Sequence, residues 1–409
     1  MMDICVIGGG PAGMLTAIFA KREKSNYNIT IIEKNSKLGK KLYITGKGRC
    51  NITNFCDVEN LISNTIGNPY FMYSSYYSFT PQNTVDFFNE IGVKTKVERG
   101  NRVFPKSDKS STVVHALEDT LVKLGVNIKL GSEVTEVVKK NEKYVVTINN
   151  KQSTFDKVVV CTGGLSYPVT GSTGFGYKVA KAMGHKVTKL YPSLVPLQVM
   201  EESEIFCKAQ GLSLKNVEVR AFIDSKKVYS ELGEMMFTHF GVTGPLILTI
   251  SRYFAGNYHK NCYIEIDMKP ALNENDLDRR ILRDFNKNIN KTLKNSFDEL
   301  LPKKLIPVFI KYIDIDGETK VNEITKEQRQ KIVKALKCLK LEIKYDNGYN
   351  EAVVTAGGIN VKEIDPSTME SKIENGLYFV GEVIDVDCLT GGYNLQVVYS
   401  TAYLCAMDL

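Results

Sequence analysis

The fold of this chain is decided by the stretch Asp3-Ile-Cys-Val-Ile7, Gly8-Gly-Gly10-Pro-Ala-Gly13 and, after a helical segment, Ile29-Thr-Ile-Ile32-Glu33. Its first, apolar part predicts a buried parallel strand. The three glycines that follow fit G-x-G-x-x-G. In such a turn the first glycine allows a tight bend, the second lets the backbone approach a pyrophosphate, and the third lets the helix pack close to the strand. The helix amides then face the phosphates.

Glu33 completes a dinucleotide-binding βαβ unit. It follows a second apolar strand, where a carboxylate accepts hydrogen bonds from a ribose 2′-hydroxyl and repels a 2′-phosphate. The alternative, a glycine-rich turn in an ordinary α/β protein, would not need an acid at this spacing. The sequence therefore predicts that Gly8, Gly10, Gly13 and Glu33 bind a dinucleotide.

Length and composition indicate a globular cytosolic protein. The 409 residues suggest about two or three domains, and 43% hydrophobic with 24% charged residues argues against wholesale disorder. The nine cysteines contain no C-x-x-C pair, so we expect no metal, and their scatter suits a reducing compartment. We see no secretory leader and no apolar run of about twenty residues, and we expect no membrane partner and a cytoplasmic location.

Two later segments repeat a strand-then-glycine pattern. Lys157-Val-Val-Val-Cys161 runs into Thr162-Gly-Gly164, and Ala352-Val-Val-Thr-Ala-Gly-Gly358 does the same near the C-terminus. Glycines at strand ends let backbone pass close to a ligand, which makes Gly163 a candidate contact. The polar loop after the second strand, which contains Lys41, follows the strand end where a cofactor would lie.

Between these segments the chain changes character twice. Short alternating segments predict antiparallel strands over residues 191–270, with 341–349 as a candidate return to them. Charged sequence with apolar residues at helical spacing predicts a helical insert over 271–340. Residues 1–190 and 350–409 then form the two parts of one nucleotide-binding domain.

The C-terminal return favours FAD over a nicotinamide dinucleotide, because the flavin and ribityl chain extend well away from the first βαβ unit. Gly376–Glu382 predicts a buried strand that ends in Gly381-Glu382, and a glycine-opened segment, Gly391–Gln396, precedes a final helix expected over Val397–Met407. Glu382 can hydrogen-bond ribityl hydroxyls, and helix amides after Gly392 can favour negative charge on the flavin. The alternative is the last βα unit of an ordinary sheet.

The sequence also resembles a known family, the FAD-dependent oxidoreductases of the BaiN, YhiN and aminoacetone-oxidase types. The resemblance covers essentially the whole chain and rests on Gly8–Gly13 with Glu33, Thr45-Gly-Lys-Gly-Arg-Cys-Asn-Ile-Thr-Asn54, Thr170–Gly176, Phe237-Thr-His-Phe-Gly-Val-Thr-Gly-Pro245, Thr355–Gly358 and Gly376–Gln396. It implies an α/β fold class: a split Rossmann-like FAD-binding domain with an inserted β-barrel-like subdomain and a helical subdomain.

The resemblance further implies which residues line the FAD. They are Ala12, Gly13, Glu33, Lys34, Gly48, Arg49, Cys50, Asn51, Glu382, Asn394 and Leu395, with the backbone of Val134 on the adenine side. This chain differs from the family at two positions, with Phe175 where Asp is frequent and Thr243 where Ser is frequent.

In a flavoenzyme the isoalloxazine carries the redox step, so the protein needs no catalytic triad. Arg49 is a candidate for stabilising reduced flavin or a substrate carbonyl, or else for a phosphate or surface contact. His239 is a candidate proton donor, against a structural role, and Tyr393 is the next candidate. For Cys50 we favour packing over a redox thiol, since no partner other than Cys56 is near in sequence.

The function expected is a FAD-dependent oxidoreductase that acts on a small organic molecule by hydride transfer, with NAD(P)H as a candidate donor that binds transiently. A flavoprotein acting on RNA is the alternative, suggested by the net charge of +7. That charge is dispersed and no aromatic-interleaved basic motif occurs, so we do not expect a nucleic-acid partner. A third candidate is a redox or scaffold protein that keeps FAD without turnover. Nothing in the sequence indicates the oligomeric state.

Overall fold

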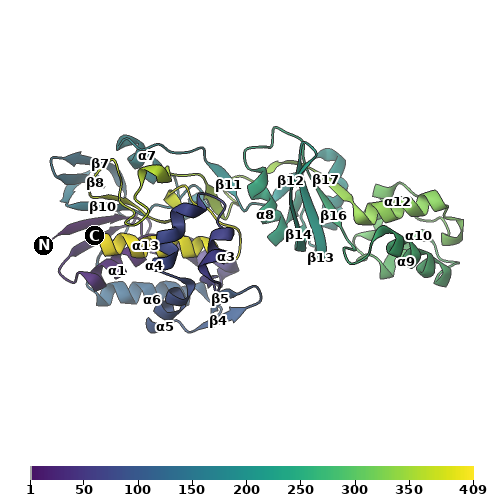
Figure 1. The fold of residues 1–409 in the computed structure, drawn as a ribbon, viewed down its shortest axis with the longest axis horizontal. Coiled ribbons are helices and arrows are strands. Elements are labelled where there is room, and N and C mark those ends of the chain that lie inside the picture. Colours follow the sequence, from purple (N-terminus) through teal and green to yellow (C-terminus); the bar gives the residue numbers. More distant parts are fainter. Residues whose placement is uncertain (1) are drawn as a thin grey trace. The chain divides into compact units, whose positions relative to one another are not determined.

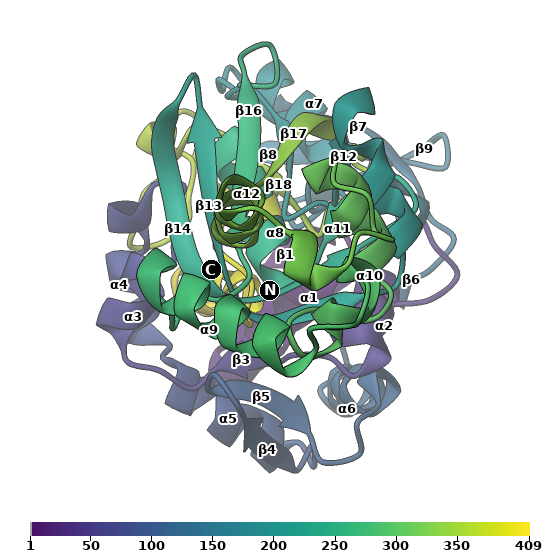
Figure 2. The same cartoon turned by 90° about the vertical axis from the view of Figure 1, so that its right-hand side faces the viewer.

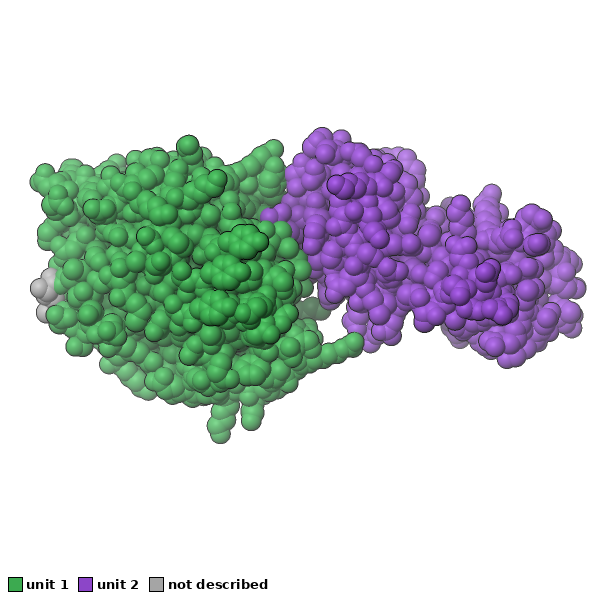
Figure 3. All heavy atoms as spheres, viewed as in Figure 1, with its two compact units in different colours: residues 1–192, 352–409 green, residues 193–351 purple. Residues whose placement is uncertain are grey.

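The computed structural model describes residues 2–409, which fall into two compact units (Figure 3). Unit 1 joins the N-terminal part of the chain, up to Pro192, to the C-terminal part from Ala352 to Leu409. Unit 2 is formed by the intervening segment, Ser193–Glu351.

Unit 1 is built on a five-stranded parallel sheet in the order β19-β10-β1-β2-β6. Its strands are β1 (Asp3–Ile7), β2 (Asn28–Ile32), β6 (Asn127–Lys129), β10 (Lys157–Val160) and β19 (Leu377–Phe379). The register pairs Ile7 with Ile32 on one side and with Val160 on the other, so that the carboxyl ends of the three strands lie at one edge. The sequence therefore predicted the central strands and their parallel arrangement correctly.

The two faces of β1 explain its apolar sequence. Ile4 and Val6 pack in a core with helices α1 (Pro11–Glu23), α6 (Ser110–Lys123) and α13 (Tyr393–Asp408), and α1 lies along α13 (Figure 1). Cys5 and Ile7 pack in a second core with β7 (Val134–Lys140), β8 (Lys143–Ile148) and α7 (Phe175–Ala182). Side chains alternate along a strand, and a parallel sheet covered on both faces needs apolar residues at every position.

Smaller elements complete unit 1. The antiparallel sheet β7-β8-β9 ends with β9, and β3-β5-β4 forms another. The bounds are β3 (Thr53–Asn54), β4 (Thr95–Glu98), β5 (Arg102–Pro105), β9 (Lys151–Phe155), β18 (Val354–Ala356), α2 (Lys40–Ile44), α3 (Val58–Ser63), α4 (Tyr73–Ser78) and α5 (Pro81–Glu90). The short strand β11 (Tyr191–Ser193) lies where the chain passes into unit 2.

Unit 2 contains a closed six-stranded barrel in the order β12-β15-β14-β13-β16-β17. Figures 1 and 2 show the long strands β13 and β14 side by side and helices α9 to α12 beyond the barrel. The elements are β12 (Leu197–Val199), β13 (Ser213–Ile223), β14 (Lys226–Phe237), β15 (Gly241–Thr243), β16 (Cys262–Asp267), β17 (Leu339–Asp346), α8 (Pro245–Phe254), α9 (Glu274–Lys287), α10 (Leu293–Ser296), α11 (Ile306–Ile313) and α12 (Lys326–Lys337). Strand β17 closes the barrel after the helical segment, pairing with both β16 and β12.

The expected fold class, a Rossmann-like α/β domain with an inserted barrel and a helical region, is confirmed. The last helix differs from expectation, because it begins at Tyr393 and not at Val397. Gly392 has a φ of 105°, a conformation that glycine adopts without penalty, and this allows the chain to enter the helix directly. Within residues 2–409, we find no helix with the length and apolar character that crossing a membrane requires.

Candidate functional site

The turn from β1 into α1 brings three glycines to the edge of the sheet. Gly8 has a φ of 109°, and a Cβ there would lie 2.5 Å from the carbonyl oxygen of Cys161. A Cβ on Gly13 would lie 2.0 Å from the carbonyl oxygen of Gly8. Gly10, in contrast, is an N-cap without a side-chain bond, and a Cβ there would meet nothing within 4 Å. The turn is thus packed tightly against its own fold and open beside the N-terminus of α1, where an anion is favoured.

Glu33 follows β2 at the same edge and is 8% exposed. Its Oε2 accepts a hydrogen bond from the backbone N–H of Gly9 at 2.7 Å. Its Oε1 accepts from both the backbone N–H and the side-chain Nδ2 of Asn35, each at 2.7 Å. A carboxylate offers about four acceptor positions, so one remains for a ribose hydroxyl.

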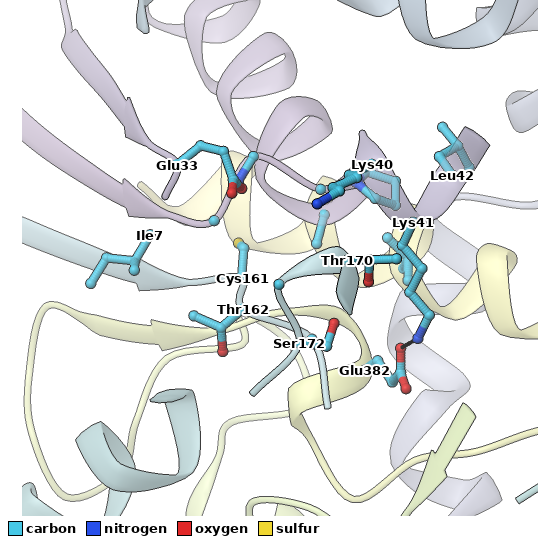
Figure 4. A pocket seen from close by; sticks show the side chains of 18 of the residues that line it. Ile7, Glu33, Lys40, Lys41, Leu42, Cys161, Thr162, Thr170, Ser172 and Glu382 are labelled. Atoms are coloured by element: carbon cyan, nitrogen blue, oxygen red, sulfur yellow. Dashed lines mark hydrogen bonds and ion pairs between the residues drawn. The ribbon is translucent and has the colours of Figure 1, made fainter. Parts of the chain in front are cut away.

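A second carboxylate, Glu382, is held by residues from three distant parts of the chain. Lys41 Nζ lies 2.5 Å from Glu382 Oε2 and donates to Ser166 Oγ at 2.6 Å. Ser166 Oγ in turn donates to Glu382 Oε1 at 2.6 Å, and the backbone N–H of Thr355 donates to the same oxygen at 3.0 Å. Figure 4 shows Lys41 and Glu382 pointing toward one another across the edge of the pocket. These contacts fix the orientation of Glu382.

These groups surround one cavity within unit 1, with about 1380 Å³ of empty space that includes a part open to solvent. The lining includes Gly8, Gly10, Ala12, Glu33, Lys34, Lys41, Val134, Gly163, Glu382, Asn394 and Leu395. The fold therefore brings together most of the residues that the sequence predicted for the cofactor, and Figure 4 shows how Glu33, Lys41 and Glu382 are arranged.

Other predicted site residues do not line this cavity. They are Gly13, Gly48, Arg49, Cys50, Asn51, Gly381, Gly392, Tyr393 and His239. Two of them pack directly against lining residues: Gly13 packs on Gly8, and a Cβ on Gly381 would lie 3.1 Å from the Cβ of Ala12. Gly392 lets the start of α13 pack closely on Thr53, since a Cβ there would lie 2.4 Å from the carbonyl carbon of Thr53.

The loop around Arg49 has contacts of its own. Arg49 pairs with Glu98 and Asp108 at 2.5 Å, and its guanidinium lies 4.2 Å from the centre of the Phe104 ring. Cys50 is fully buried, and burial raises the pKa of its thiol to about 12. A neutral thiol at physiological pH is a poor nucleophile. Asn51 Oδ1 is buried with no hydrogen-bond partner among the described residues.

Two candidate catalytic residues differ in position. Tyr393 is the first residue of α13, directly before the lining residues Asn394 and Leu395. His239 is an exposed residue of unit 2, and its ring packs edge-on against Phe240 at 4.9 Å. The roles of both residues stay predictions that mutagenesis can test.

Sequence reasoning missed several lining residues, among them Asn35, Thr162, Thr170, Ser172 and Phe175. The glycine-rich stretch Thr170–Gly176 was visible as a helix opening and could have marked the last three. No sequence pattern marked Asn35, because its role depends on the groups that its side chain hydrogen-bonds in the folded chain and not on its distance along the chain from a motif.

The lining fits FAD. Open space beside Gly10 suits a diphosphate at the α1 N-terminus, and Glu33 keeps one acceptor position for a ribose. Thr162 Oγ1, in the cavity wall, is buried without a hydrogen-bond partner in the described part of the chain, as expected for an atom that a ligand satisfies. The glycine turn would hold the diphosphate, Glu33 the adenosine ribose, and Glu382 the ribityl chain.

Comparisons with known proteins agree with this fold. A family model described as HI0933-like protein Rossmann domain matches residues 2–408. The chain is 32% identical to a 3-dehydro-bile acid delta(4,6)-reductase of Clostridium scindens, over 99% of this chain and 98% of that protein. It is also 32% identical to a ribosomal RNA dihydrouridine synthase of Haemophilus influenzae, over 99% and 97%. A 3-ketosteroid delta1-dehydrogenase from Sterolibacterium denitrificans covers the whole chain with a TM-score of 0.53 at 12% identity, which shows a shared fold alone.

Proposed function

The chain belongs to the HI0933-like family of FAD-dependent oxidoreductases, and from this premise we propose that it reduces a carbon–carbon double bond conjugated to a carbonyl group. The names of the two relatives support this reaction class. A 3-dehydro-bile acid delta(4,6) substrate and a uridine both carry a double bond next to a carbonyl. Our first candidate substrate is a small organic molecule of this kind.

The observation that carries the proposal is a cavity within unit 1 in which the glycine turn, Glu33 and Glu382 all face one space. FAD carries a diphosphate, an adenosine ribose and a ribityl chain, which match the anion site, the ribose acceptor and the second carboxylate of this lining. FAD bound here and reduced by an electron donor would supply a hydride, which together with a proton reduces the double bond. The protein residues bind and orient it: Gly9 and Asn35 fix Glu33, and Lys41 with Ser166 fixes Glu382.

The reaction class is tested by anaerobic mixing. The purified protein is loaded with FAD, reduced with dithionite, and mixed with cyclohex-2-enone, a 3-oxo-4-ene steroid or the corresponding saturated ketones. We expect flavin absorbance to return with the unsaturated compounds only, and mass spectrometry to show a product heavier by two hydrogens. Reoxidation by oxygen alone, with no response to any conjugated compound, would exclude small enones as substrates.

We also propose that FAD is bound tightly but without a covalent bond, since no attachment residue stands out in the lining. Acid precipitation should release a yellow chromophore that chromatography identifies as FAD. Recovery of FMN, or a flavin that stays on the precipitated chain, would contradict this assignment.

A second candidate substrate is uridine in ribosomal RNA, and the Haemophilus influenzae relative is the observation that favours it. The same reduced protein is mixed with ribosomal RNA, and dihydrouridine is mapped by mass spectrometry. A gel-shift titration at several salt concentrations measures the number of phosphate contacts, because binding through phosphates weakens steeply with salt. Dihydrouridine formation without enone turnover would replace the first candidate with the second.

The sequence pattern predicts weak binding of NAD(P)H, or another electron donor altogether. We see no second complete G-x-G-x-x-G unit with a strand before it and an acid after it, so NAD(P)H would bind only transiently. We expect micromolar or weaker saturation by NAD(P)H in anaerobic rapid mixing. Nanomolar saturation would show that a dedicated nicotinamide site exists.

A further inference from the structure

The segment 167–174, which we call the strap, forms part of the cavity wall. It leads from the loop after β10 into α7, and Tyr167, Gly171 and Gly174 within it have positive φ values of 50°, 113° and 80°. Thr170 and Ser172 are 9% and 7% exposed and, like Gly171, line the cavity. Figure 4 shows Thr170 and Ser172 on a segment between the Lys41 and Cys161 sides of the pocket.

On one side the strap is fastened to the residues that follow Glu33. Asn35 Nδ2 donates to the carbonyl oxygen of Thr170 at 3.0 Å and to Glu33 Oε1 at 2.7 Å. Lys34 Nζ donates to Thr173 Oγ1 at 2.9 Å. One side-chain amide therefore joins the carboxylate predicted to hold the adenosine ribose to the backbone of the strap.

The fit at this fastening is close. A Cβ on Gly171 would lie 2.7 Å from Asn35 Nδ2 and 3.3 Å from Lys34 Cε. Ser172 Oγ, also in the strap, lies 2.9 Å from the position of a Cβ on Gly163, in the loop after β10. Glycine at 171 and 163 thus lets the strap lie directly against both edges of the cavity.

We propose that Asn35 is a positioning residue which latches the strap to Glu33, so that the strap closes over the adenosine end of FAD and slows its release. The inference rests on the proposed function only in taking FAD as the ligand of this cavity. Asn35 itself need not touch the cofactor. It couples the position of the ribose-binding carboxylate to the closed position of the strap.

The first test measures release of FAD. FAD-loaded protein is mixed with excess apoflavodoxin or another flavin trap, and the change in flavin fluorescence gives the dissociation rate. Asn35→Ala removes the two hydrogen bonds that its side-chain amide donates, to Glu33 and to Thr170, and should speed release about tenfold or more, as expected for a lost bond to a charged group. Asn28→Ala is the matched control, because it removes an amide–carboxylate bond of 2.7 Å at the opposite end of β2, to Asp3, and should release FAD at the wild-type rate.

The second test approaches the latch from the strap. Gly171→Ala places a methyl group against Asn35, whereas Gly92→Ala, with a φ of 92° and nothing within 4 Å, reproduces the backbone strain without a clash. Gly171→Ala should speed release and Gly92→Ala should not. Because both changes break the same hydrogen bond, the double variant Asn35→Ala with Gly171→Ala should release FAD no faster than the faster single variant.

Hydrogen exchange separates a latch from general loosening. In FAD-loaded Asn35→Ala, peptides over 167–174 should exchange faster than in the wild type while those over β1 and α1 stay unchanged. Wild-type release rates in folded Asn35→Ala, additive effects in the double variant, or faster exchange throughout unit 1 would each overturn the latch. A wild-type protein that binds no FAD would instead overturn the proposed function, and these two failures are distinguishable in the same experiment.

Discussion

Replacing Glu33 tests the central proposal most directly, because this carboxylate has a proposed role and an observed one. We propose that it holds the adenosine ribose, and in the structure it accepts three hydrogen bonds of 2.7 Å from Gly9 and Asn35. Glu33→Ala removes the acceptor for all three donors. Hydrogen bonds to charged groups contribute about 1.5–3 kcal/mol each and are not additive, so we expect the protein without FAD to lose about 2–4 kcal/mol of stability.

The consequence is measurable without turnover. For a domain of this size 1 kcal/mol shifts the unfolding midpoint by about 2–4 °C, so Glu33→Ala should lower the midpoint of the FAD-free protein by roughly 4–16 °C. Its FAD affinity should fall about ten- to a hundredfold in addition, from loss of the ribose contact. Glu33→Gln, which keeps one acceptor oxygen, should fall between the wild type and Glu33→Ala in both measurements.

Glu142→Ala is the control, because it removes an exposed carboxylate in the turn between β7 and β8. It should change neither the midpoint nor the affinity. An unchanged midpoint in Glu33→Ala would show that the three hydrogen bonds do not hold the glycine turn. An unchanged FAD affinity in a folded variant would show that Glu33 does not contact the cofactor.

Further predictions concern the glycine turn, the buried Cys50 thiol and His239. Gly10→Ala should fold and yet bind FAD at least tenfold more weakly, as titration would show, whereas Gly13→Ala, with its Cβ 2.0 Å from a carbonyl oxygen, should lower the thermal midpoint by several degrees. Burial raises the pKa of the Cys50 thiol from 9.0 to about 12, so its thiolate fraction at pH 8 is about a thousandfold lower than in the unfolded chain, and iodoacetamide should modify it only in urea. The stability that this pKa difference contributes to the folded state is fully present below pH 9 and is lost as the pH rises from 9 toward 12. Over that pH range the stability of the wild type should therefore fall more steeply than that of Cys50→Ala. His239→Asn should keep FAD and its spectrum while slowing substrate-dependent reoxidation about 10²–10⁴-fold and leaving reoxidation by oxygen unchanged; equal slowing of both would make His239 structural.

How much of the site could be read from the sequence depends on how local each signal is. Strand, glycines, helix, second strand and Glu33 lie within one continuous stretch, and the close approach of Gly13 to the carbonyl oxygen of Gly8 lies inside that stretch. The Gly381-Glu382 strand end could be found in the same way. In each case a backbone requirement restricts the residue type at a fixed distance along the chain.

Other contacts were invisible for the opposite reason. Lys41 and Glu382 are separated by 341 positions, yet they lie 2.5 Å apart, because Lys41 follows β2 and Glu382 follows β19 in the same parallel sheet. Asn35 meets Thr170 across 135 positions in the same way. The sequence motif around Arg49 resembles a flavin-binding loop. In the structure the Arg49 side chain forms ion pairs with Glu98 and Asp108, contacts that the motif did not predict.

By itself the sequence determined that this chain forms a dinucleotide-binding βαβ unit, carries a late strand ending in an acid, and contains a barrel-like and helical insert. Only the tertiary structure decided which side chains fasten those parts together: Asn35 to the strap, Ser166 and Lys41 to Glu382, and Gly9 to Glu33. The physical reason is that backbone geometry and apolar periodicity are set by neighbours in the chain. Hydrogen bonds between side chains depend instead on strand order and register, which bring together residues that the chain keeps far apart.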